Sequence, residues 1–420
     1  RGAPGVSRAP LAKAPERPEL AAKQGPPAAA AAAEAAPEPG PGAGGEPPAV
    51  PAVQEPCDAQ KSQERREREY YNAFFGEPCG PGNRLILEVE LGRGAFSTVF
   101  RCKDMKAQGK EYAVKFIRLN PVLRKATELE VKLMRRLRVE AAERDSEGAS
   151  RLLGLAGPEA FEHEGHLALV FQLQRCSLLA WMQTCSPGRG LPLASVRSYG
   201  RDIFLALRAL RRVGVVHNDL KPDNLLLSLD RASVKLSDFG CAFDAKERHR
   251  AAYVRPAYCS SYRAPEAVLG QRFGPQVDTW GAGTTLFELA AGRRLFAERT
   301  NNGMLHAMLQ VCGAFPKRLA TAGKLAAKHF DKHGDFKLKD PGSAGGEAVV
   351  PMARFKRPSR PLLQSLEGAA LEQAGEAAGS SLRLLADLLS GCLAPDPAMR
   401  TVPDAALGHR LLRPLTGASA

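Results

Sequence analysis

The residues best suited to chemistry lie in one short segment, His217-Asn-Asp-Leu-Lys-Pro-Asp-Asn224, which is followed soon afterwards by Asp238 in an Asp-Phe-Gly triplet. Asp219 could accept the proton of an attacking hydroxyl, and Lys221 could neutralise charge on a transferred phosphoryl group. Asn224 and Asp238 offer the hard oxygen ligands that Mg²⁺ prefers. Five fixed residues at this spacing would arise by chance about once in ten thousand chains of this length. The pattern therefore predicts phosphoryl transfer.

A second segment could hold phosphates, and it runs from Gly92 to Val99 between two strand-like stretches. Glycines let backbone amides approach phosphate oxygens with no side chain in the way. Gly94 also fits this use, whereas Ser97 stands at the position of a third glycine, and a simple hairpin turn has a similar pattern. Lys115 follows on the next strand-like stretch, where it could hold the α- and β-phosphates of a nucleotide.

A buried lysine requires a partner of opposite charge, so Lys115 should have a carboxylate nearby. The helical stretch 127–137 contains two candidates, Glu128 and Glu130. They point to different helix faces, so only one of them can face the lysine. Glu130 is the first choice and Glu128 the alternative.

Taken in chain order, these motifs resemble those of the eukaryotic protein kinases, and within them the CMGC group. The resemblance covers roughly residues 70–413. Within the group the chain is most similar to the family of pre-mRNA-processing-factor-four (splicing) kinases. The segments that carry this similarity are Tyr70-Tyr71, Gly76-Glu77, 166–171, 196–199, 204–207, 221–225, 300–305 and 329–331.

The resemblance implies an α+β, bilobal protein-kinase fold, with a small β-rich N-lobe at about 85–172 and a larger α-helical C-lobe at about 173–413. The kinase domain as a whole would span 69–413. It would contain a low-complexity insertion at about 340–381, whose Gly, Ala, Ser and Pro content predicts a loop rather than core. ATP and Mg²⁺ are the implied cofactors.

The resemblance also implies which residues would surround the nucleotide. Phe171 would be the gatekeeper beside the adenine, and the stretch from Gln172 to Gln174 would be the hinge whose backbone pairs with it. The pocket would be lined by Leu91, Val99 and Ala113. For each apolar residue, packing in the core is an equally good explanation.

Two charged residues late in the chain are implied to pair. Glu266, in Ala-Pro-Glu, resembles the carboxylate that ties the activation segment of kinases to the larger lobe, and Arg400 resembles its arginine partner. An ordinary surface charge is the alternative for either residue alone. Their joint presence favours the pair.

The activation segment departs from the family pattern at several positions. Asn218 replaces the Arg that usually precedes the catalytic Asp and grips a phosphate on this segment. Cys259 stands at the usual Thr or Ser, and Ser260 replaces an Arg that helps the CMGC group favour a following proline. A proline-directed preference is therefore not carried over. Tyr253 and Tyr258 are candidate autophosphorylation sites, with loop packing as the alternative.

The pattern of apolar residues predicts the elements that must position these motifs. Residues 85–115 have the short-period alternation of a strand meander. Helical spacing follows at 195–212, 279–291, 304–311 and 382–393. Strands come first and helices later.

Composition separates two terminal tails from the foldable part. Residues 1–60 contain 13 of the 32 prolines and no aromatic residue, which predicts a disordered N-terminal tail over 1–68. Residues 414–420 are predicted as a second tail. The whole chain has a net charge of +14, and the first sixty residues are slightly acidic, so the positive charge belongs to the foldable part. Acidic, phosphorylated or nucleic-acid partners would suit it, or the charge is simply dispersed over the surface.

Several classes of protein are excluded. No apolar run approaches the roughly 18 residues of a membrane span. Nine cysteines without a CxxC pair argue against a zinc ribbon or a complete disulfide framework.

The prediction is a monomeric serine/threonine protein kinase of the nucleus, or of the cytoplasm, that acts on spliceosomal or Arg/Ser-rich proteins and contacts RNA only indirectly. A pseudokinase scaffold and an RNA-associated interaction protein are the alternatives.

Overall fold

The computed structural model of the 420-residue chain describes residues 67–246, 261–339, 346–370 and 376–414. Nearly all of the expected N-terminal tail, 1–68, lies outside these residues. By their contacts the described residues divide into two compact units: 67–125 with 160–169, and 126–159 with the described residues from 170 onward. The lobe boundaries expected at about 85, 172 and 413 remain a prediction.

The strands of the first part of the chain form a six-stranded sheet in the order β1-β2-β3-β4-β6-β5. The strands are β1 (Pro78–Cys79), β2 (Leu85–Arg93), β3 (Ser97–Asp104), β4 (Lys110–Ile117), β5 (Leu155–His163) and β6 (His166–Gln172). Strands β2, β3 and β4 are consecutive antiparallel neighbours, as the meander prediction required. A short 3₁₀ helix, η1 (Pro81–Asn83), connects β1 to β2.

Alternation along β3 and β4 separates a core face from an open face. Phe100, Val114 and Phe116 are each at most 2% exposed on the core face. On the open face lie half-exposed residues, among them Val99 and Lys115, which are paired directly across β3 and β4. The sequence alternation therefore fixes which side chains of these strands stay accessible.

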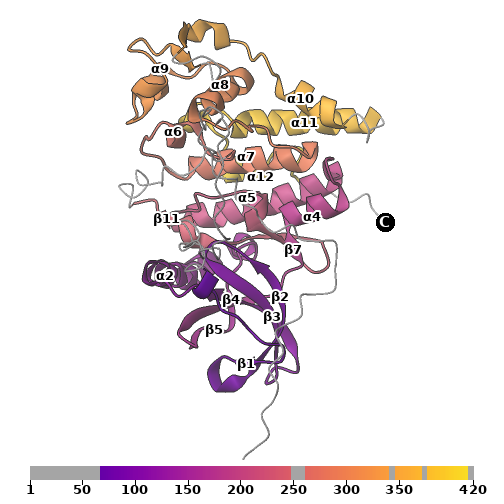
Figure 1. The fold of residues 1–420 in the computed structure, drawn as a ribbon. Coiled ribbons are helices and arrows are strands. Elements are labelled where there is room, and N and C mark those ends of the chain that lie inside the picture. The colour runs from indigo at the N-terminus through magenta and orange to yellow at the C-terminus, as the bar shows by residue number, and fades with distance from the viewer. Residues whose placement is uncertain (1–66, 247–260, 340–345, 371–375, 415–420) are drawn as a thin grey trace, which may run out of the picture. The chain divides into compact units, whose positions relative to one another are not determined.

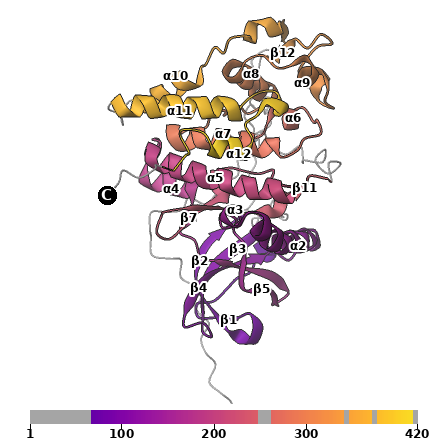
Figure 2. The ribbon, with the colours of Figure 1, turned by 180° about the vertical axis from the view of Figure 1, so that it is seen from behind.

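The second unit is mainly helical. Its helices are α2 (Pro121–Arg144, from residue 126 on), α3 (Ser146–Ala149), α4 (Leu178–Cys185), α5 (Leu193–Val213), α6 (Pro265–Val268), α7 (Gln276–Ala291), α8 (Asn301–Cys312), α9 (Lys317–Thr321), α10 (Leu362–Ala370), α11 (Glu376–Cys392) and α12 (Pro403–Leu407). Helices α5, α7 and α11 lie in successive layers (Figures 1 and 2). Helix α7 is buried along almost its whole length, so it forms the centre of this unit. The stretches with predicted helical spacing fall within α5, α7, α8 and α11, apart from one residue at the end of α11.

Short strands and 3₁₀ helices connect the helices. The strands are β7 (Cys176–Ser177), β8 (Val215–Val216), β9 (Leu225–Leu227), β10 (Val234–Leu236), β11 (Phe243–Asp244), β12 (Phe336–Lys339) and β13 (Glu347–Val350). The 3₁₀ helices are η2 (Pro222–Asn224), η3 (Phe239–Cys241), η5 (Ala326–Lys328), η6 (Met352–Phe355) and η7 (Pro397–Met399). In the described part of the chain, no helix has the length and apolar character that crossing a membrane requires.

The expectation of a loop at about 340–381 is wrong for the residues described there. They include β13, η6, α10 and the beginning of α11. Leu362 and Leu366, four residues apart and therefore on one face of α10, are 8% and 1% exposed. The alanines that suggested low complexity are also strong helix formers. Composition alone therefore hid an amphipathic helix.

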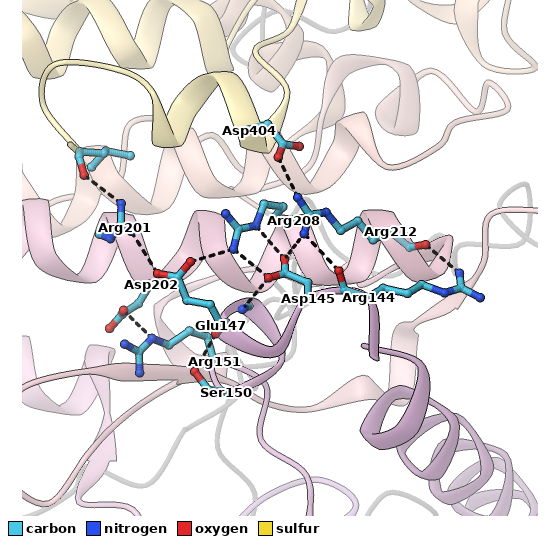
Figure 3. Close-up of polar contacts among 12 residues, drawn as sticks. Arg144, Asp145, Glu147, Ser150, Arg151, Arg201, Asp202, Arg208, Arg212 and Asp404 are labelled. Atoms are coloured by element: carbon cyan, nitrogen blue, oxygen red, sulfur yellow. Dashed lines mark hydrogen bonds and ion pairs between the residues drawn. The ribbon is translucent and has the colours of Figure 1, made fainter. Parts of the chain in front are cut away.

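Ion pairs and backbone bonds hold residues 126–159 in the second unit (Figure 3). Asp145 caps α3 and lies 2.7 and 2.8 Å from two nitrogens of Arg208 on α5. Glu147 also accepts a bond from Arg208, at 2.9 Å. Leu153 donates its amide to the carbonyl of Leu236 at 2.8 Å. This network fixes the C-terminal end of α2 and the turn after it.

Replacing Asp145 by Asn should destabilise the protein in a pH-dependent way. Burial raises the pKa of Asp145, but the bonds from Arg208 and Gly148 and the charges of Arg208 and Arg212 lower it by more. A lowered folded-state pKa contributes stability above the unfolded pKa of about 3.9, and that contribution is lost as the pH falls through the folded value.

We expect the Asp145→Asn variant to lose about 1–3 kcal/mol of unfolding free energy at pH 7, measured by urea titration. The difference from the native chain should shrink below about pH 4. Asp404→Asn removes a carboxylate of the same network that is 57% exposed, so it should change the free energy by less than about 0.5 kcal/mol. A gap that is constant with pH would contradict the assignment.

Candidate active site

Two pairs of short strands bring the predicted catalytic segments together. The segment 217–224 joins β8 to β9, and the segment 237–242 joins β10 to β11. Strand β9 pairs with β10, and β8 pairs with β11, both antiparallel. Each pairing brings ends of the two segments close together, so the two loops become neighbours.

A buried carboxylate holds the backbone of the first segment. Asp278, near the beginning of α7, accepts hydrogen bonds from the amides of His217 and Asn218 at 2.8 and 2.7 Å. The φ angle of Asn218 is 66°, in the left-handed region, which Asn adopts more readily than most residues. His217 is fully buried, and its Nε2 donates to the carbonyl of Ser237 at 3.0 Å. The two segments are thus bonded through His217.

Lys221 and Asn224 both converge on Asp219. Lys221 Nζ lies 2.7 Å from Asp219 Oδ2, and Asn224 Nδ2 donates to the same oxygen at 3.0 Å and to the Asp219 carbonyl at 2.8 Å. The carboxylate is therefore held in one orientation by two donors. Burial lowers the pKa of Lys221, but the charge and bond of Asp219, with the charges of Asp223 and Asp238, raise it by more. Lys221 is accordingly a cation at neutral pH.

Asp238 stands at the end of β10, next to the catalytic segment. Ser237 donates its amide and its hydroxyl to the carbonyl of Asn224 at 2.8 and 2.9 Å, which fixes the preceding residue. Asp238 is exposed and has a φ of 64°. A Cβ atom placed on Gly240 would lie 3.4 Å from Asp238 Oδ1 and 3.7 Å from Glu130 Oε2. The structure therefore brings Glu130 to the Asp-Phe-Gly turn.

The predicted phosphate-binding residues belong to β2, β3 and β4 of the first unit. Gly92 pairs with Val99, and Val99 pairs with Lys115, so the three share the open face of the sheet. Ala113 lies on the same face, two residues before Lys115 on β4. Leu91 is 37% exposed, as part of the strand end.

The turn itself runs between β2 and β3. Gly94 is exposed, and its amide donates to the carbonyl of Ser97 at 2.9 Å. Ser97, which replaces the expected third glycine, is only 7% exposed. The serine therefore belongs to the base of the turn rather than to its tip.

The predicted hinge begins at the end of β6, in the second unit. Phe171 is half-buried, and Lys235 Nζ donates to Gln172 Oε1 at 3.2 Å. Gln174 Nε2 donates to the carbonyl of Leu173 at 3.1 Å. These bonds hold the glutamine side chains locally, and the role of the segment beside an adenine stays a prediction.

Glu266 and Arg400 form a two-pronged pair in the core of the second unit. Their nitrogen–oxygen distances are 2.5 and 2.7 Å, and the residues are 2% and 4% exposed. Arg400 Nε also donates to the carbonyl of Ala394 at 2.9 Å, and its guanidinium lies 5.0 Å from the ring centroid of Trp280. The implied pairing of these two residues is present.

Some predicted residues lie outside the described part of the chain, and others were missed. Tyr253, Tyr258 and Cys259 fall in the stretch 247–260, which is not described. The anchoring role of Asp278 was not predicted. Its sequence signal is an acidic residue at the beginning of a mainly apolar helix, where buried charges are rare without partners.

Comparisons with known proteins agree with this geometry. The model of the family "Protein kinase domain" matches residues 85–412. The chain is 32% identical to the serine/threonine-protein kinase prp4 of Schizosaccharomyces pombe over 340 residues, which cover 81% of this chain and 68% of that protein. It is 27% identical to the serine/threonine-protein kinase prpf4B of Dictyostelium discoideum over 82% of this chain and 41% of the relative.

A further relative belongs to a different kinase type. The dual specificity tyrosine-phosphorylation-regulated kinase mbk-2 of Caenorhabditis elegans is 28% identical over 78% of this chain and 38% of its own length. The chain thus spans less than half of two of these three relatives. The family match nevertheless covers most of the chain, including both predicted catalytic segments and strands β2 to β6 of the sheet. The chain belongs to the protein kinase family and is a serine/threonine protein kinase.

Proposed function

We propose that the chain transfers the γ-phosphoryl group of ATP to serine and threonine hydroxyls of proteins, with Asp219 as the base that accepts the hydroxyl proton. The observation that carries the proposal is the convergence of Lys221 and Asn224 on one Asp219 oxygen. Within the described part of the chain both side-chain bonds fall on Asp219 Oδ2, so Asp219 Oδ1 would be the oxygen that faces a substrate hydroxyl, with the Lys221 cation beside the transferred group. A base held in one orientation could come within hydrogen-bond reach of the hydroxyl proton, as general-base catalysis requires.

The donor set fits Mg²⁺ and ATP. Asn224 Nδ2 is occupied by Asp219, so the amide oxygen is the remaining polar atom of this side chain, and oxygen is the ligand that Mg²⁺ prefers. Asp238 supplies an exposed carboxylate, whose charge helps to raise the pKa of Lys221. Magnesium-bound ATP would supply the phosphoryl group and neutralise its charge. Asn224 and Asp238 are the residues proposed to hold the metal.

We assign the remaining roles on the same basis. Gly92 and Gly94 would approach the phosphates, and Lys115 would hold the α- and β-phosphates. Glu130 is 7% exposed, whereas Glu128 is exposed, and the buried carboxylate is the better partner for a lysine. We propose that the domain extends from residue 69 to 413.

The proposed substrates are proteins of the splicing machinery, including Arg/Ser-rich proteins, and the proposed location is the nucleus. The similarity to prp4 and prpf4B supports this choice. The net charge of +14 would also favour partners that already carry acidic or phosphorylated segments. We propose that RNA is contacted only indirectly, through these proteins.

The full chain should be tested with γ-labelled ATP, Mg²⁺ and two peptides, one rich in Arg and Ser and one acidic. We expect label on serine or threonine, and loss of label when a chelator removes the metal or when Asp238 is replaced by Ala. Transfer by the native chain no greater than by Asp238→Ala would refute the proposal. Nucleotide binding without transfer would indicate a scaffold, and salt-sensitive RNA binding without transfer would indicate an RNA-associated protein.

A further inference from the structure

The segment before β1 is built into the first unit although the family match begins only at residue 85. We call residues 67–77 the N-terminal strap. Tyr71 is 2% exposed, and its ring stacks on Phe116 with 4.1 Å between centroids and 15° between planes. The amide of Gly76 donates to the carbonyl of Leu87, and the amide of Leu87 donates to the carbonyl of Glu77, both at 2.9 Å. The strap is therefore fixed to the sheet.

Tyr70, the neighbour of Tyr71, reaches the glycine-containing turn. Its phenol Oη donates to the carbonyl of Gly94 at 2.9 Å. The guanidinium carbons of Arg93 and Arg118 lie 4.9 and 5.1 Å from its ring centroid, a distance at which a cation is attracted to the ring. The ring thus lies between a cation at the end of β2 and a cation just after β4.

Arg118 binds the same turn at its next two residues. Its Nη1 donates to the carbonyl of Ala95 at 2.5 Å, and its backbone amide donates to the carbonyl of Phe96 at 3.1 Å. Arg118 is in turn paired with Glu69 of the strap, whose carbonyl accepts the amide of Leu119 at 2.8 Å. Three consecutive carbonyls of the turn are therefore bonded by Tyr70 or Arg118.

These bonds determine the direction of the amides in the turn. In a trans peptide the C=O of one residue and the N–H of the next point to opposite sides. Because the carbonyls of Gly94 and Ala95 point to Tyr70 and Arg118, the amides of Ala95 and Phe96 point the other way. Oriented backbone N–H groups in a tight turn form a site for an anion. A phosphate is the anion of the proposed function.

We propose that Tyr70 is a positioning residue for nucleotide binding. Tyr70 holds the turn so that the amides of the turn are directed at the phosphates before the nucleotide arrives. This inference rests on the proposed function for its ligand, but the tether itself concerns only the strap and the turn. A turn ordered in advance loses less conformational entropy on binding, and this gain appears as affinity. The strap is thereby part of the nucleotide site.

The test is the full chain with Tyr70 replaced by Phe, which keeps the ring between the two arginines and removes only the hydroxyl. We expect KM for Mg-ATP to rise about three- to tenfold, with kcat and KM for the peptide within twofold of the native values. Without nucleotide, hydrogen exchange of the Gly94 amide, which closes the turn by its bond to the carbonyl of Ser97, should become about three- to tenfold faster. The melting temperature should stay within about 2 °C, because only one exposed bond is lost.

Tyr199→Phe is the matched control, since it also removes a phenol-to-backbone bond, from Tyr199 Oη to the carbonyl of Arg231 at 3.1 Å in the second unit. It should leave both KM and the exchange of the Gly94 amide unchanged. Exchange in Tyr70→Phe equal to that of the native chain would overturn the tether, whether or not the chain transfers phosphate. Faster exchange with an unchanged KM would overturn its role in nucleotide binding, and an inactive native chain would refute the proposed function alone.

Discussion

Replacing Asp219 by Asn should reduce kcat for peptide phosphorylation by about 10²- to 10⁴-fold, because loss of a positioned general base has this effect. Asn has the same shape as Asp, and its oxygen can still accept bonds from Lys221 and Asn224. In the native chain Lys221 Nζ and Asn224 Nδ2 lie 2.7 and 3.0 Å from Asp219 Oδ2. The amide is not basic enough to take a hydroxyl proton. We therefore expect the affinity for nucleotide to change by less than about threefold.

The measurement is steady-state kinetics with the full chain, beside calorimetric titration with nucleotide. Asp230→Asn makes the same change of charge in an exposed turn of the second unit, where the carboxylate accepts bonds from Ser228 and Ala232. It should retain full activity. An Asp219→Asn variant that keeps more than a tenth of the native kcat would show that another group accepts the proton.

Replacing Arg400 by Leu should produce the largest loss of stability. It leaves the carboxylate of Glu266, which is 2% exposed, without its cation, and it removes the bond to the carbonyl of Ala394. Breaking one partner of a buried pair costs about 3–5 kcal/mol. For a unit of this size that corresponds to a fall in melting temperature of roughly 6–20 °C, measurable by scanning calorimetry.

Two further variants separate the pair from general effects of losing an arginine. Arg318→Leu breaks an ion pair with Asp396 in which the arginine is 70% exposed, so the melting temperature should hardly change. Adding Glu266→Gln to Arg400→Leu removes the uncompensated buried charge and should restore part of the lost stability. No recovery in the double variant would assign the loss to packing against Trp280 instead.

The sequence predicted best those parts whose chemistry and local pattern agree. The segment from His217 to Asn224 combines charged residues with fixed spacing, and the helical spacing of 195–212 lies within α5 as a strongly amphipathic element. The choice of Glu130 over Glu128 rested only on a preference between two helix faces. Glu130 is buried and Glu128 is exposed, and the pairing of Glu130 with Lys115 stays a prediction.

Two features could not be obtained in this way, for physical reasons. At 340–381 the composition suggested a loop, whereas the four-residue spacing of the buried Leu362 and Leu366 is typical of an amphipathic helix. The strap has no local periodicity of its own, because its order comes from contacts such as Tyr71 on Phe116, which are distant in sequence. Contacts of this kind between distant residues cannot be predicted from any short window of the sequence.

The strap also determines where the chain can be shortened without harm. A protein cut at residue 85, where the family match begins, would lack β1 and Tyr71. Strand β2 would become an open sheet edge, and one face of the Phe116 ring would be left bare. Unpaired edges beside uncovered apolar rings promote association between copies. Such a fragment would form insoluble aggregates for a reason unrelated to its catalytic residues.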